Sequence, residues 1–402
     1  MSDKRLEASP QPVTVLSRRV DPDGDATPVL AELVGVLGGF RGRFSAGATV
    51  LIKPNFVAPF PAATTDLAII AAVADAIREA GGVPVVGESS GYEFASESTH
   101  AVLGVKPYLA ERDITFVNLD EYPYDEVTLA TTGQRVELTR LALEAEMIVN
   151  LPVLKGHTIT KVTGAVKNSF GLLSRESRRK LHVRGLHAGI AALSRHFPTA
   201  LHFVDARNLL VRAVFSDVRP LGFFLAAEDP FALDHFGSKL LGIDPESVAH
   251  LTGVPDYVVD GALPEGAESE LSRRDAPRNR LHRAMYSAFY LVDDVKSRTV
   301  GGDSLIPHLH WSLGVHPELG TLSDEELERL AALCPVGAID VSTRRIVAEK
   351  CMPVRCMACL RAASEPGAVT LKGLNPPRPG ATATKPTPAP TGSTPAPPEK
   401  TG

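Results

Sequence analysis

The four cysteines of the sequence lie within a window of 26 residues. They are Cys334, Cys351, Cys356 and Cys359, and the last three form a C-x4-C-x2-C motif. Four thiolates grouped this closely can ligate either an iron–sulfur cluster or a tetrahedral zinc ion. Zinc sites usually draw their cysteines from two close pairs, whereas this spacing is three plus one. The spacing therefore favours iron–sulfur ligation, and a structural zinc site remains the alternative.

The segment around these cysteines resembles one half of a bacterial two-cluster ferredoxin. In that family a close cysteine triple and a separate cysteine followed by proline ligate the clusters. Here Cys334 precedes Pro335, a short hairpin pattern follows, and the triple comes after it. The first gap of the triple is longer than the family's C-x2-C, and Glu365 stands where a second Cys-Pro cysteine would be. The resemblance implies one 4Fe-4S cluster held by the four cysteines.

A second group of polar residues follows short apolar runs in the first half of the chain. Ligands of α/β proteins bind at the carboxyl ends of strands, and lysine, asparagine and imidazole groups there suit an anionic or carbonyl-bearing ligand. The residues predicted to bind substrate are Lys53, Asn55, Glu88, Ser89 and Lys155. The residues predicted to be catalytic are Lys167, Asn168 and His157, with His157 as the proton donor.

Several motifs containing these residues resemble the domain of unknown function 362 family over residues 50 to 245. They are KPN at 53–55, TTD at 64–66, GESSG at 87–91, LKGH at 154–157, TGAVKNSFG at 163–171 and AEDPFALD at 227–234. Members are often labelled uncharacterised iron–sulfur centre proteins, and a ferredoxin-like segment is a recurring companion of the domain. The lysine in a glycine-rich loop is also similar, more distantly, to the N-terminal domain of lactate racemase.

Two other patterns leave alternatives open. His182 and His187 could bind a second metal, although no third ligand is evident at helical or hairpin spacing. GESSG also fits the nucleophile elbow of α/β-hydrolases, which makes Ser89 a rival nucleophile. Its partners would be Asp205 and either His235 or His250.

The elements that position these residues alternate between strands and helices. Buried strands are predicted at 49–57, 83–89, 114–120, 146–154, 201–206 and 221–227. A helix capped by Thr64 or Thr65 and ended by Gly81 follows the first of them. This pattern predicts an α/β domain over residues 10–260, with a mixed or largely parallel sheet flanked by helices.

The remainder of the chain divides into three parts. Residues 261–321 are predicted to be a connecting region with one docking helix at 281–299. Residues 322–373 form the ferredoxin-like α+β iron–sulfur segment, whose first helix begins with a capping box of Ser323 and Glu326. Residues 374–402 are rich in proline, threonine and alanine and are predicted to be disordered.

Composition limits the partners of the protein. The chain has 402 residues, with 42 basic and 47 acidic side chains and a net charge of −5, which argues against nucleic acid. It has neither a signal-peptide pattern nor an apolar run long enough for a membrane span, so no membrane partner is expected and a cytoplasmic location is predicted. The oligomeric state, including a homo-oligomer, stays open.

These observations predict an iron–sulfur oxidoreductase. The cluster would pass electrons to a small-molecule substrate in the α/β pocket, and an external donor of the ferredoxin or flavodoxin type would supply them. The first alternative is a non-enzymatic electron carrier that docks on a partner through the helix at 281–299. The second alternative is a serine hydrolase that uses Ser89.

Overall fold

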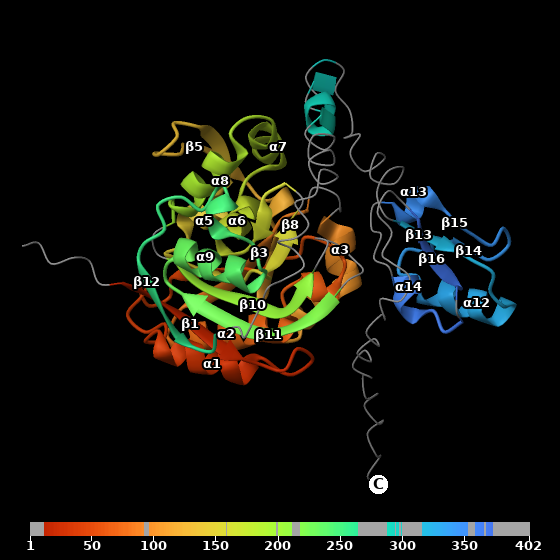
Figure 1. Cartoon of the computed structure of the whole chain (residues 1–402), viewed down its shortest axis with the longest axis horizontal. Helices are drawn as coiled ribbons and strands as arrows, with labels where there is room; N and C mark the ends of the chain where they lie inside the picture. The colour runs from red at the N-terminus through yellow and green to blue at the C-terminus, as the bar shows by residue number, and fades with distance from the viewer. Residues whose placement is uncertain are drawn as a thin grey trace, which may run out of the picture.

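An eight-stranded sheet forms the centre of the N-terminal part of this computed structural model (Figure 1). The structure describes residues 12–91, 96–157, 159–197, 200–210, 218–263, 288–293, 295–296, 299, 316–352, 358–365 and 367–372. The predicted tail at 374–402 lies outside these ranges. In spatial order the strands are β12 (Tyr257–Gly261), β1 (Val13–Arg19), β11 (Val218–Ala227), β10 (Ala200–Leu210), β7 (Met147–Asn150), β2 (Thr49–Lys53), β3 (Val83–Glu88) and β4 (Thr115–Asn118).

The sheet is largely parallel, as predicted. Only β11 runs against its neighbours β1 and β10, and the other adjacent pairs are parallel. All six predicted strands contribute to the sheet; β2, β3, β4 and β7 are shorter than predicted, and β10 and β11 are longer. The prediction missed β1 and β12, which pair with each other and extend the sheet beyond β11.

Helices cover both faces of the sheet because the strands carry apolar side chains on both faces. Val50 and Ile52 of β2 pack into one core with α1 (Thr27–Val36), α2 (Leu67–Glu79) and α4 (Val105–Ala110). Leu51 faces a second core on the opposite side. The helices of this second side are α5 (Arg140–Glu144), α7 (Arg175–Val183), α8 (Leu186–Ser194) and α9 (Pro230–Leu240).

The start of α2 differs from the prediction. Asp66 caps the helix by accepting a hydrogen bond from Ala68 N at 2.9 Å. Thr65 instead accepts from Asn55 N at 2.8 Å and donates to Leu151 O at 2.6 Å. Its hydroxyl therefore ties two strand ends together, a long-range contact that takes precedence over local capping.

Short elements connect the strands and helices. They are α3 (Ser96–Leu103), the hairpins β5 (Tyr124–Thr128) with β6 (Arg135–Thr139) and β8 (Lys155–His157) with β9 (Lys161–Thr163), the short helix α6 (Ala165–Asn168), and the 3-10 turns η1 (Pro61–Ala63), η2 (Leu119–Glu121), η3 (Ser169–Leu172) and η4 (Pro245–Ser247). No helix in the described ranges is long and apolar enough to cross a membrane.

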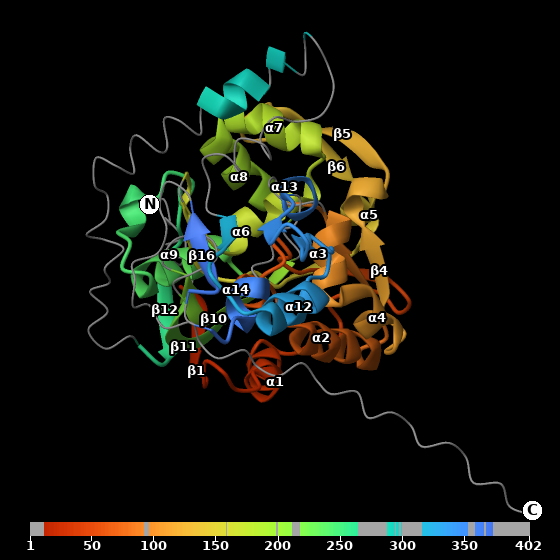
Figure 2. The ribbon, with the colours of Figure 1, turned by 90° about the vertical axis from the view of Figure 1, so that its right-hand side faces the viewer.

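The C-terminal elements form a separate α+β group on the α3 side of the sheet unit (Figures 1 and 2). They are α12 (Asp324–Leu333), α13 (Ala348–Cys351), α14 (Ala358–Ala362) and the antiparallel pairs β13 (His316–Leu319) with β16 (Val369–Lys372) and β14 (Ile339–Asp340) with β15 (Arg345–Ile346). Ser323 caps α12 as predicted. In a capping box the side chain of Glu326 would accept a hydrogen bond from Ser323 N. Here Ser323 N donates to Glu365 instead, and Glu326 accepts hydrogen bonds from Arg329 and Ser364.

Candidate functional site

A buried ion pair joins the ends of two neighbouring parallel strands. Lys53 is the last residue of β2 and Glu88 the last of β3, and Lys53 Nζ lies 2.6 Å from Glu88 Oε1. Lys53 is 1% exposed and Glu88 4%. The carboxylate also accepts hydrogen bonds from Phe56 N at 3.1 Å and Ser89 N at 2.8 Å. Burial lowers the pKa of Lys53, and Glu88 opposes that shift.

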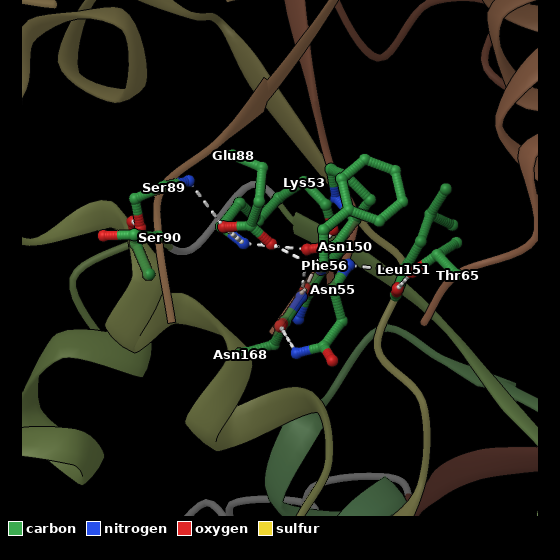
Figure 3. Close-up of polar contacts among 12 residues, drawn as sticks. Lys53, Asn55, Phe56, Thr65, Glu88, Ser89, Ser90, Asn150, Leu151 and Asn168 are labelled. Atoms are coloured by element: carbon green, nitrogen blue, oxygen red, sulfur yellow. Dashed lines mark hydrogen bonds and ion pairs between the residues drawn. The ribbon is translucent and has the colours of Figure 1, made fainter. Parts of the chain in front are cut away.

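Asn168 at the end of α6 completes this arrangement (Figure 3). Its Nδ2 donates toward Lys53 O at 3.2 Å, Pro54 O at 3.1 Å and Asn150 Oδ1 at 2.8 Å. Its Oδ1 accepts from Asn55 Nδ2 at 2.7 Å. The term buried polar network is used below for Lys53, Asn55, Glu88, Asn150 and Asn168. Its side chains satisfy one another, so it fixes three strand ends against α6.

Two glycines permit this close packing. A Cβ atom at Gly171 would lie 2.9 Å from Lys53 Nζ. A Cβ atom at Gly164 would lie 2.2 Å from Asp234 Oδ1. That carboxylate accepts from Ala165 N at 2.7 Å and Val166 N at 2.9 Å, so it caps α6, while burial raises its pKa to about 7. The glycines of the TGAVKNSFG motif thus make room for the groups that hold α6 in place.

Lys155 extends from the network toward the segment before α2, which contains η1. Its Nζ donates to Asn55 Oδ1 at 2.6 Å and to Ala63 O at 2.7 Å. Burial lowers the pKa of Lys155 to about 7, and Glu88 acts in the opposite direction. An ammonium group has three hydrogens, so the charged form keeps one for an additional acceptor.

His157 is held in a defined tautomer at the end of β8. Its Nδ1 accepts hydrogen bonds from Ile159 N at 3.1 Å and Thr160 N at 3.2 Å. The neutral ring therefore carries its hydrogen on Nε2. Burial lowers the pKa of His157 well below the usual value, and the charge of Lys167 lowers it further. His157 is a neutral donor at neutral pH.

Lys167 precedes Asn168 in α6 but belongs to a different environment. The side chain is half-buried, and in the described part of the chain its Nζ has no hydrogen-bond or ion-pair partner. Burial lowers the pKa of Lys167 well below its usual value, and the charge of Lys155 contributes. α6 packs against α8, which carries His187.

Three further histidines lie on or against the helices α7 and α8. The ring of His182 in α7 stacks on Tyr290 with 4.6 Å between centroids, and its Nδ1 donates to Arg178 O at 2.7 Å. His187 and His250 stack with 5.6 Å between centroids and their Nδ1 atoms 3.4 Å apart. Burial lowers the pKa of His182 to about 4 and that of His250 to about 3, and it also lowers the pKa of His187.

The term histidine pocket is used below for His157, Lys167, His182, His187 and His250. His250 is completely buried, and its Nε2 has no hydrogen-bond partner. The sequence leaves open a second metal bound by His182 and His187, and in the structure His187 instead stacks on His250. Within the described ranges no three His, Cys, Asp or Glu side chains are grouped to hold a metal ion.

Ser89 lacks the contacts of a hydrolase nucleophile. Its hydroxyl donates to Gly171 O at 2.8 Å. Of the predicted partners, Asp205 instead pairs with Arg207 at 2.7 Å, and His235 bonds Tyr257 at 2.8 Å. Among the described contacts, no imidazole is placed to take the proton of Ser89.

Two members of these sites were missed from the sequence. Asn150 ends β7 as Lys53 ends β2, so the same strand-end signal was available. His250 appeared only as an alternative hydrolase partner. Its stacking partner His187 lies 63 residues away, and no local pattern indicates that contact.

The cysteine segment is described for three of its four thiols. Cys351 is buried, Cys334 and Cys359 are half-buried, and Cys356 lies outside the described residues. Cys334 and Cys359 pack against one small core that includes Leu330. Cys334 Sγ accepts a hydrogen bond from Ala338 N at 3.2 Å.

The cysteine segment also contacts the α/β unit. Leu360, next to Cys359, packs against a cluster formed by Ala58, Phe60, Ala63 and Leu210. The carbonyl oxygen of Ala63 is the acceptor for Lys155. The cysteine-bearing helix α14 therefore packs against the segment that follows Asn55 of the buried polar network and that accepts a hydrogen bond from Lys155.

The fold is that of a mixed α/β protein, with a large, mainly parallel sheet flanked by helices and polar groups at its strand ends. Residues 50–239 match the family model described as "Domain of unknown function (DUF362)", close to the extent that the motifs predicted. The chain is 28% identical over 238 residues to the thylakoid-associated protein sll1697 of Synechocystis, a match that covers 56% of this chain and 73% of that protein.

A solved structure, the lactate racemase apoprotein from Thermoanaerobacterium thermosaccharolyticum, matches with a TM-score of 0.38 and 13% identity. The match covers 57% of each chain, so this protein spans less than two thirds of that racemase.

Proposed function

We propose that this protein is an iron–sulfur reductase that acts on a small substrate in the histidine pocket. The observation that supports it is the contact of Leu360, next to Cys359, with the loop whose Ala63 carbonyl binds Lys155. A redox centre at the cysteines would lie against the border of the substrate site. An external donor of the ferredoxin or flavodoxin type would supply electrons, and a cytoplasmic location belongs to the same proposal.

The cysteine segment has a donor set that fits a 4Fe-4S cluster. Cys334, Cys351 and Cys359 lie on one small α+β unit, and Cys356 lies between the last two in sequence. The hydrogen bond from Ala338 N to Cys334 Sγ is of the kind that tunes cluster sulfurs, and Lys350 Nζ reaches Gly337 O in the adjoining turn. A bound cluster would supply single electrons.

Lys155 and the side chains of the histidine pocket have separate roles in this proposal. Lys155 and Lys167 bind and orient an anionic or carbonyl-bearing substrate. His157 donates a proton from Nε2, because its Nδ1 is occupied by two backbone amides. The buried polar network keeps the ends of β2, β3 and β7 in register with α6, so that both lysines hold fixed positions.

The first test is the content of iron, sulfide and zinc in anaerobically purified protein, with electron paramagnetic resonance after dithionite reduction. The proposal expects about four irons and four sulfides per chain and a reduced-cluster signal. About one zinc without sulfide would contradict it.

The second test asks whether the reduced centre is reoxidised by small carbonyl acids. Leu360→Ala should slow this reoxidation because it loosens the contact with the α/β unit. Leu333→Ala is the matched control, because Leu333 is a half-exposed leucine next to Cys334. Equal rates in the two variants would contradict the proposed route.

A non-enzymatic electron carrier is the second candidate. The described part of the predicted docking helix exposes Leu291, Val292 and Val295, each at about half of its surface. Such a carrier would give the same metal analysis, but no small molecule would reoxidise it.

A further inference from the structure

Lys167 differs from the other buried lysines of the α/β unit in what surrounds its amine. Lys53 pairs with Glu88, and Lys155 donates to two oxygens. Lys167 Nζ has neither kind of partner among the described residues, and the side chain is half-buried, so part of its surface is exposed to solvent.

Burial lowers the pKa of Lys167 well below its usual value, and the charge of Lys155 contributes. Lys155 and His157 lie on β8, whose partner strand β9 leads into α6. On its other side α6 packs against α8, which carries His187. Among the described residues no carboxylate forms an ion pair with Lys167. An amine desolvated beside a second cationic group is kept neutral and nucleophilic.

We propose that Lys167 forms an imine with a small aldehyde or ketone that also carries a carboxylate, as a 2-oxo acid does. Lys155 supplies the cation for the carboxylate through its remaining hydrogen, and Lys167 supplies the nucleophile. The inference rests on the proposed function only in placing the substrate in the histidine pocket, and it requires no electron transfer.

The step balances with the groups present. The lone pair of Lys167 Nζ adds to the carbonyl carbon, and the carbonyl oxygen takes the Nε2 proton of His157. The amine then returns a proton to the ring, and the hydroxyl leaves as water with a second proton as the C=N bond forms. The sum is amine plus carbonyl giving imine plus water, with no oxidant or reductant.

The test is reductive trapping on the full chain. The protein is incubated with pyruvate or glyoxylate and sodium cyanoborohydride, and the modified peptides are mapped by mass spectrometry. The expected adduct lies on Lys167, disappears in Lys167→Arg and persists in Lys180→Arg, which changes an exposed lysine of α7. Acetaldehyde, which lacks the carboxylate, should label about tenfold less, in line with the loss of one charge-assisted contact.

The pH of the trapping makes the result selective. An exposed lysine with a pKa of about 10.4 is neutral in only about one molecule in ten thousand near pH 6.5, so labelling of Lys167 should exceed that of Lys180 at least about tenfold. Equal labelling of the two, or no adduct at Lys167 in correctly folded protein, would overturn the imine.

The same experiment separates the two proposals. Protein treated with an iron chelator should give the same Lys167 adduct, because imine formation does not use the cysteines. An adduct in a protein that never reduces a carbonyl acid would sustain the imine and refute the reductase. Electron transfer to such acids without any adduct at Lys167 would sustain the reductase and refute the imine.

Discussion

The buried polar network and the histidine pocket contain two lysines of the same α/β unit in opposite circumstances. Lys53 is almost completely buried and has a carboxylate at 2.6 Å, whereas Lys167 is half-buried among imidazoles with no described partner. Asn168 next to Lys167 belongs to the network. The ion pair of Lys53 with Glu88 holds two strand ends together. Lys167 is held in position because Asn168 next to it belongs to the network, but the network supplies no carboxylate to pair with its amine.

The largest effect is expected from breaking the ion pair of the network. Glu88→Ala leaves Lys53 buried without its partner and should lower the free energy of unfolding by about 3–5 kcal/mol. Urea denaturation measures this loss. The double variant Lys53→Met/Glu88→Leu should recover much of it, because it removes both charges. A loss below about 1 kcal/mol in Glu88→Ala would show that the pair is not buried as described.

A smaller loss is expected from Asn168→Ala. The substitution leaves Asn150 Oδ1 and Asn55 Nδ2 without their partner inside the protein, at a cost of about 3 kcal/mol. Asn118→Ala is the control, because that amide bonds only its near neighbours Asp120 and Glu121 at the end of β4. Equal losses in the two variants, measured by urea denaturation, would argue against a cooperative network.

The contribution of the histidine pocket to the free energy of unfolding should depend on pH, unlike that of the buried polar network. The folded pKa of His182 is about 4, below the ordinary 6.5, so the unfolded chain binds more protons between these values. The stability that His182 contributes above pH 6.5 is therefore lost as the pH falls toward 4, by about 2 kcal/mol.

His182→Phe checks this pH dependence. It keeps an aromatic ring against Tyr290 and Phe170 and should flatten the dependence of stability on pH. Asp234, whose pKa is raised to about 7, acts in the opposite direction and is present in both proteins, so the difference between them isolates His182. Parallel pH curves would contradict the assignment.

The smallest effect is expected from Lys167→Met. Since the amine has no described partner, its removal should change the free energy of unfolding by less than about 1 kcal/mol, with either sign. Lys53→Met is the matched comparison and should be strongly destabilising, because Glu88 is then left buried. Urea denaturation measures both variants. If Lys167→Met lowered the free energy of unfolding as much as Lys53→Met, the two lysines would not differ in the way described.

Strand positions could be predicted because each strand is a short run of buried apolar residues. The same runs placed Lys53 and Glu88 at strand ends, where the structure has them. β1 and β12 were missed, because they extend the sheet by pairing across more than 200 residues. The predicted catalytic and substrate-binding roles, and the cluster ligands, stay predictions.

The sequence by itself determined which residues end the strands, because apolar periodicity is a local property of the chain. Only the tertiary structure decided their partners. It placed Asn168 across from Lys53, 115 residues away in sequence, and stacked His187 on His250. Strand order and loop paths set such contacts, and they depend on how the whole sheet packs. For the same reason, the pairing of Lys53 and the isolation of Lys167 could not be inferred from two lysines in neighbouring motifs.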